Sequence, residues 1–73
     1  MNEWIAARAS ALGVDALTPE EISLLLNLAG DAAHESGART NAPLLCYLLG
    51  RAHSVQGGER TLAELAEIVR STS

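Results

Sequence analysis

The sequence contains no lysine and no phenylalanine, and its aromatic residues are one tryptophan and one tyrosine. All five basic residues are arginines, and nine acidic residues outnumber them, so the net charge is -4. A domain that binds nucleic acid by neutralising phosphates usually presents a basic face. These arginines are scattered among acids instead, and we therefore expect no nucleic-acid partner.

Cysteine and long apolar runs are also scarce. The single cysteine, Cys46, excludes an internal disulfide, and no spacing of cysteine and histidine is typical of structural zinc. A lone thiol fits a reducing cytoplasm. The apolar runs are far shorter than the ~20 residues that cross a bilayer, and the opening M-N-E-W-I-A-A-R lacks the pattern of a secretion signal. We expect a cytoplasmic protein without a membrane segment.

Capping signals divide the chain into helices. The run Thr18-Pro19-Glu20-Glu21 supplies a capping threonine, a first-turn proline and a capping-box glutamate. Thr61 and Glu64 form a second such box, and Asn2 is suited to cap the first helix. Between these signals, apolar residues recur at helical spacing, without strand-like alternation. The pattern predicts a single helical domain over residues 1–73, with helices over about 2–13, 18–36, 42–55 and 61–70.

The segment 42–55 is expected to lie at the centre of the fold. No charged residue falls between Arg39 and Arg51, and a helix that is apolar all round is enclosed by its neighbours or covered by a second chain. We predict an all-α fold, a small four-helix bundle around this largely buried helix. The expected inner stripe of the first helix comprises Trp4, Ile5, Ala9 and Leu12.

A polar cluster is expected where the second helix meets the central one. Asp31 and His34 are three residues apart and so share a helical face, and Arg39 and Asn41 follow in the connecting bridge. A carboxylate beside a histidine orients the imidazole, and an arginine is a candidate anion contact or inter-chain anchor. Tyr47 is a further candidate partner contact. The alternative is structural: these polar groups cap helix ends or solvate a face, and Tyr47 packs in the core.

The central helix carries two residues of metal-binding type. Cys46 and His53 lie on one stripe of it, and His34 on the neighbouring helix is a conceivable third ligand. However, the patterns C-x-x-C and H-E-x-x-H are absent, and a buried free cysteine usually packs as a small apolar residue. We predict no metal, no cofactor and no catalytic residue.

The apolar residues are more numerous than so small a bundle can hide. A chain of 73 residues buries only roughly 60% of its unfolded surface. We therefore expect part of the apolar surface to form a homodimer or to dock on a larger protein. The residues concerned are Trp4, Leu24, Leu28 and Tyr47, with some of Leu44, Leu45, Leu48 and Leu49.

Several short motifs carry a family resemblance. They are Ala33-His34, Arg39, Ala42-Pro43-Leu44 and Gly50, together with the opening N-E-W-I-A-A. In these motifs the chain resembles a small actinobacterial family of helical domains of unassigned function. The resemblance implies a link to molybdenum cofactor biosynthesis, because similar domains are appended to, or named after, the guanylyltransferase that makes molybdopterin guanine dinucleotide. It implies an accessory role, since these residues contain nothing like the α/β nucleotidyltransferase domain.

The sequence thus predicts a non-enzymatic helical interaction or accessory module that is homo-oligomeric or bound to a larger protein. In that module Asp31 and His34 orient one another and Arg39 is the anchor. The alternative prediction is a small-ligand domain that binds a pterin or a nucleotide, in which Arg39 receives a phosphate and the polar cluster reads the head group.

Overall fold

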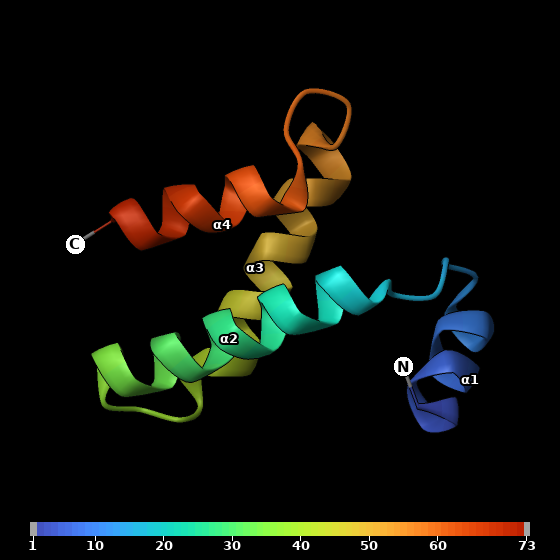
Figure 1. The fold of residues 1–73 in the computed structure, drawn as a ribbon, viewed down its shortest axis with the longest axis horizontal. Coiled ribbons are helices and arrows are strands. Elements are labelled where there is room, and N and C mark those ends of the chain that lie inside the picture. Colours follow the sequence, from blue (N-terminus) through green and yellow to red (C-terminus); the bar gives the residue numbers. More distant parts are fainter. Residues whose placement is uncertain (1, 73) are drawn as a thin grey trace.

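The computed structural model describes residues 2–72, which form four α-helices and no strand (Figure 1). The helices are α1 (Glu3–Leu12), α2 (Pro19–Ser36), α3 (Asn41–Gln56) and α4 (Leu62–Ser71). The predicted all-α fold is confirmed. Within the described residues, no helix is long and apolar enough to cross a membrane.

Both predicted capping boxes are formed. Thr18 Oγ1 accepts the Glu21 N–H at 3.1 Å, and a Glu21 carboxylate oxygen accepts the Thr18 N–H at 2.8 Å. Thr61 and Glu64 repeat this arrangement at the start of α4 with the same two distances. The Asn2 side chain caps α1. These bonds satisfy backbone N–H groups that have no partner inside the helix, so the starts of α1, α2 and α4 agree with the sequence to within a residue.

The start of α3 is built differently. Thr40 stands at the cap position, but its backbone already has helical dihedral angles and its side chain makes no capping hydrogen bond. A backbone hydrogen bond stands in place of a side-chain cap: the Asn41 N–H donates to the Ala38 carbonyl at 3.0 Å. Thr40 and Asn41, just before Pro43, have the residue types that predict a side-chain cap for this helix, and that prediction is wrong. Such a cap needs an extended residue, and here the turn continues directly into the helix.

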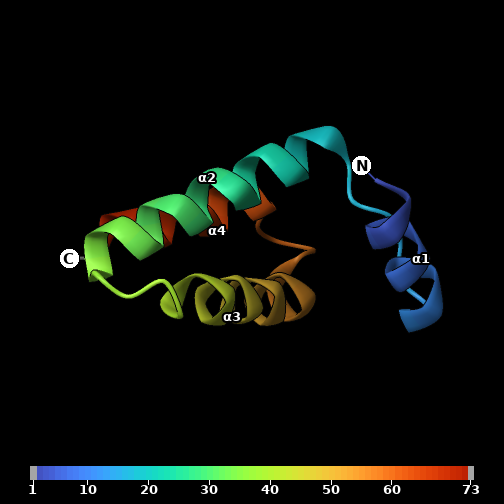
Figure 2. The same cartoon turned by 90° about the horizontal axis from the view of Figure 1, so that it is seen from below.

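Three helices form the packed body of the molecule. Figure 2 shows α2 and α4 side by side in one layer, with α3 in a second layer beneath them. The core lies where the layers meet, and the buried residues are Leu28, Leu49, Leu65 and Ala66. Each of the three helices contributes at least one of these residues, so α3 is central in the sense that both other helices pack on it.

The first helix stands apart from this body. Within the described residues, no Cα atom of α1 comes within 8 Å of a Cα atom of another helix, and α1 has no buried residue. The prediction of an inner stripe on α1 is wrong, since Trp4 and Leu12 are exposed. The apolar spacing of α1 marks a face suited to packing against another helix. In the described residues no other helix lies against that face.

The predicted burial of α3 is also wrong. Leu49 is its one buried residue, whereas Leu44, Tyr47 and Leu48 are exposed. Both neighbours pack on the same side of α3 (Figure 2), so two covering helices leave the opposite side open. The sequence pattern allowed for a second chain as an alternative cover.

Candidate functional site

The polar cluster lies at the C-terminal end of α2. Asp31 and His34 share a face, as predicted, and line an open hollow of about 350 Å³ together with Glu35 and Arg70. Arg70 comes from α4 and contacts Asp31 at 3.5 Å between Nη2 and Oδ2. Both side chains are largely solvent-exposed, so this ion pair contributes ~1 kcal/mol or less to stability.

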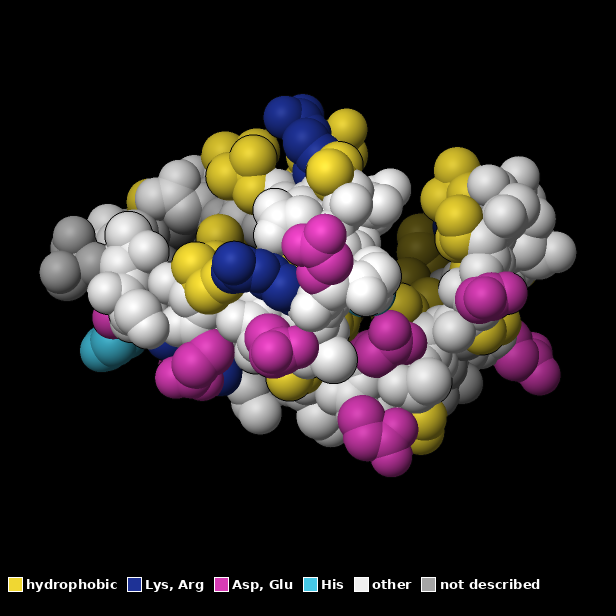
Figure 3. All heavy atoms as spheres, turned by 90° about the horizontal axis from the view of Figure 1, so that it is seen from above, with side chains coloured by type: hydrophobic (Ala, Val, Ile, Leu, Met, Phe, Trp, Pro, Cys, Tyr) yellow, Lys and Arg dark blue, Asp and Glu magenta, His cyan; other side chains and the backbone are white. Residues whose placement is uncertain are grey.

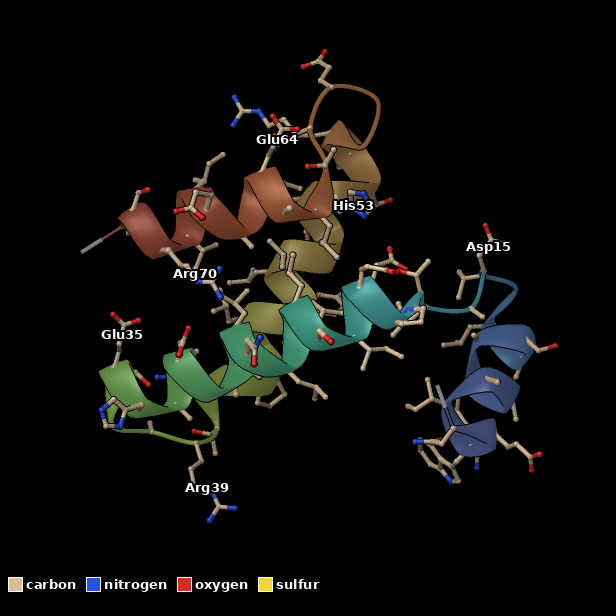
Figure 4. All side chains as sticks on the ribbon, viewed as in Figure 1. Asp15, Glu35, Arg39, His53, Glu64 and Arg70 are labelled. Carbon is tan, nitrogen blue, oxygen red and sulfur yellow. The ribbon has the colours of Figure 1, made fainter. Side chains whose placement is uncertain are left out.

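Arg39 does not take part in this cluster. Figure 4 shows its side chain extending away from the body, on the other side of α2 from Arg70. The cation beside Asp31 is instead Arg70, and the predicted role of Arg39 as an anion contact or inter-chain anchor stays a prediction. Sequence reasoning missed Arg70, because nothing in its local pattern says that the last turn of α4 lies beside α2.

The remaining two candidates lie elsewhere. Asn41 lines a separate hollow of about 650 Å³, which α2, α3 and α4 enclose at their ends with Glu35, Leu45 and Val69 among the lining residues. Tyr47 is 67% exposed on the outer side of α3, and the Arg51 guanidinium lies 5.1 Å from its ring centroid. The structure thus brings Asp31 and His34 together and separates Arg39, Asn41 and Tyr47 from them.

The three candidate metal ligands, Cys46, His53 and His34, do not form a metal site. Among residues 2–72 there is no group of three or more histidine, cysteine or acidic side chains placed to hold a metal ion. The thiol of Cys46 is half-buried and belongs to no disulfide.

The clearest electrostatic effect lies at a helix start. The pKa of Glu64 falls below its ordinary value of 4.5, because its carboxylate accepts the backbone N–H of Thr61 and bonds to the Thr61 hydroxyl. Both bonds stabilise the charged form, and the nearby Arg60 adds to this effect. This is the chemistry of a helix cap, and it serves stability.

The largest accumulation of one kind of side chain is apolar and exposed. On α3 it comprises Leu44, Tyr47, Leu48 and Val55, and on α1 and the following turn Trp4, Leu12 and Val14. An apolar groove of about 460 Å³ runs between α3 and α4, and a smaller hollow of about 310 Å³ separates α1 from α2. Figure 3 shows the gap beside α1, with hydrophobic atoms inside it.

The fold is that of a small all-α domain. Its most extensive surface feature is the set of exposed apolar residues on α1 and α3. The whole chain, residues 1–73, matches the model of a family described as a domain of unknown function, DUF6457, and the chain belongs to that family. This confirms the part of the resemblance that indicated a domain family without assigned function. No curated protein and no solved structure shows significant similarity to the chain.

Proposed function

We propose that the chain is a non-catalytic helical interaction module that associates with a second copy of itself. The observation that carries this proposal is its exposed area. The chain exposes 5552 Å², whereas a compact monomer of its 7.6 kDa mass exposes about 4,300 Å². The excess is about 1,200 Å² per chain, within the roughly 1,000–2,500 Å² that each subunit of an obligate homodimer buries.

The kind of surface supports the same proposal. Among residues 2–72, eleven large hydrophobic residues are exposed, Val55 and Leu12 most of all at 80% and 77%. Single exposed apolar residues are ordinary, but groups of them on one helix are typical of interaction sites. Only four residues are buried among those the structure describes, so a partner would supply the packing that the chain does not provide for itself.

The polar cluster supports a role without catalysis. Asp31 is paired with Arg70 at the surface, and water reaches both side chains. A group that moves protons or attacks a substrate is usually set in a dry pocket that shifts its pKa. In the proposed role the polar side chains of the cluster keep the ends of α2 and α4 hydrated. The ion pair between Asp31 and Arg70 joins these two helices.

A native mass spectrum of the purified chain at low micromolar concentration tests the proposal. The expected spectrum shows a species of twice the 7.6 kDa chain mass, without additional bound mass. A spectrum with the single-chain mass alone, at every concentration up to the millimolar range, would contradict self-association.

The second candidate function is binding of a pterin or a nucleotide at the polar cluster. The hollow beside His34 favours it, since about 350 Å³ suits a small ligand. Two features speak against it: Arg70 is already paired with Asp31, and Arg39 extends away. His34→Ala and Arg70→Ala separate the two functions, because both side chains line the hollow. Both substitutions abolish binding of the pterin nucleotide if the second candidate is right, and leave any affinity intact if it is wrong.

The resemblance adds a cellular setting to the proposal. In that setting the module is a cytoplasmic accessory of molybdenum cofactor biosynthesis, and its partner is the guanylyltransferase. Mixing the purified chain with that enzyme, and measuring the mass of any complex, tests the link. We expect a complex at micromolar concentrations, and two separate masses would remove the link without affecting self-association.

A further inference from the structure

We propose that one face of α3 joins the two copies and that the two α3 helices lie antiparallel. The α3 outer face, as we define it, consists of Leu44, Tyr47, Leu48, Arg51 and Val55. This inference rests on the self-association proposed above. It specifies which surface of each copy forms the contact and how the two α3 helices are oriented.

The spacing of these residues places them on one stripe of the helix. Steps of three, four and seven residues recur between them, so they lie within about a third of the helix circumference. The buried Leu49 marks the opposite side of α3. α2 and α4 both lie on the Leu49 side (Figure 2), and α1 contacts no other helix, so no helix within residues 2–72 covers the outer face. Its four hydrophobic members are each at least 55% exposed.

The charge distribution favours a second copy as the occupant. None of the nine acidic residues lies on α3. On the face that Figure 3 draws, the upper edge, where α3 lies, shows hydrophobic and basic side chains and no acidic ones, and the acidic side chains lie below it. Two copies of net charge -4 repel least when their acid-bearing sides point outward. Contact through the two α3 outer faces achieves this.

The composition of the face is that of an interface core. Tyrosine and arginine are enriched there, and lysine and acidic residues are depleted. Arg51 does not stand alone, since its guanidinium lies over the Tyr47 ring. At Leu48 the face continues into the apolar groove between α3 and α4, which Leu45 and Ile68 also line. The contact area therefore extends beyond the helix itself.

Arg51 also decides the orientation. Parallel α3 helices related by a two-fold axis place Arg51 beside Arg51 of the second copy, which brings like charges together. Antiparallel helices centred on the face place Leu44 beside Val55 of the second copy. The same register sets Arg51 level with Leu48 of the second copy, one residue along the axis from the position of the second copy's Tyr47, whose ring attracts a cation. Antiparallel pairing therefore offsets the two Arg51 residues by about 4.5 Å along the axis and gives each of them an aromatic neighbour on the second copy.

The first experiment is Leu44→Glu in the full chain, with sedimentation equilibrium as the measurement and circular dichroism as the check of folding. Leu44 is 62% exposed in the single chain, so the variant folds. We expect the dimer dissociation constant to rise about 100-fold or more, because each copy brings one unpaired carboxylate into the interface. The matched control is Leu26→Glu on α2, at a residue that is 68% exposed and outside the face, and it leaves dimerisation unchanged.

The second experiment adds Val55→Arg to Leu44→Glu. Antiparallel pairing sets the new guanidinium beside the new carboxylate of the second copy, so the dimer returns. Within one chain the two positions are about 16 Å apart along the helix, too far to pair. A double variant that stays monomeric, a Leu44→Glu variant that dimerises like the original chain, or an equal loss in Leu26→Glu overturns this inference while leaving self-association in place. An original chain that is monomeric throughout overturns both.

Discussion

At the residue scale, side-chain hydrogen bonds decide where three of the four helices begin. The sequence was sufficient to predict these starts, because a capping box involves residues only three positions apart and needs no distant partner. Thr18 and Thr61 are the two examples. Thr40 shows the limit of such reasoning. Its residue type suits a cap, but the backbone turn before α3 decides that its side chain is not used.

The caps give a direct comparison between two threonines. We expect Thr61→Ala to lower the free energy of unfolding by ~1 kcal/mol, because it leaves the Glu64 N–H without its hydroxyl acceptor. Thr40→Ala is the control and changes stability by less than ~0.5 kcal/mol, since its side chain makes no capping bond. Urea denaturation of both variants measures the difference, and equal losses would contradict this account.

The lowered pKa of Glu64 has a consequence for pH dependence. A carboxyl group with a lower pKa in the folded chain contributes stability above its ordinary value of 4.5, and this contribution is lost as the pH falls through the lowered pKa. An NMR titration should place the pKa of Glu64 below 4.5. In Thr61→Ala it should rise only part of the way toward 4.5, because the hydroxyl is lost while the backbone N–H of residue 61 still donates to the carboxylate. An unchanged titration curve in the variant would show that the Thr61 hydroxyl does not contribute to the shift.

At the element scale, the sequence predicts which helices exist better than what covers them. The apolar spacing of α1 and α3 is real, but whether an apolar face is buried depends on the distant parts of the chain that reach it. In the described residues no other helix reaches α1, and α2 and α4 both pack on the same side of α3. The candidate site follows the same rule. Asp31 and His34, three residues apart on one helix, line the same hollow, whereas Arg70, which pairs with Asp31, comes from another helix.

Because α1 stands apart from the packed body, shortening a side chain to alanine should lower the free energy of unfolding more in the body than on α1. Leu65 is 4% exposed in the core, so Leu65→Ala should cost 2–5 kcal/mol (approximate range for a buried leucine). Trp4→Ala removes a larger side chain, but one that is exposed on a helix without buried residues, and should change stability by less than ~0.5 kcal/mol. Thermal and urea unfolding measure both. A larger loss in Trp4→Ala would mean that α1 packs on the body.

At the scale of the whole molecule, the chain exposes more surface than its mass requires, and much of that surface is apolar. Composition alone indicated an excess of apolar residues, but only the arrangement of helices shows where the excess lies. Leu28 is buried, for example, whereas Leu44 and Leu48 on the α3 outer face are not. The acid-free helix α3 has an open face, which links the charge pattern of the sequence to a contact between two copies.

Association predicts that thermal stability depends on chain concentration. If the dimer supplies part of the packing, mass action raises the melting temperature as the concentration increases. Differential scanning calorimetry from micromolar to millimolar chain should show a steady rise for the original chain. For Leu44→Glu the rise should be smaller and begin at about 100-fold higher concentration, so this variant serves as the internal control. A melting temperature that is constant in both would contradict a stabilising dimer.

The central claim is that the chain associates with a second copy, and sedimentation equilibrium over a range of concentrations tests it most directly. The account predicts a mass that rises from 7.6 kDa toward twice that value as the concentration increases. A mass that stays at 7.6 kDa up to millimolar chain would contradict it.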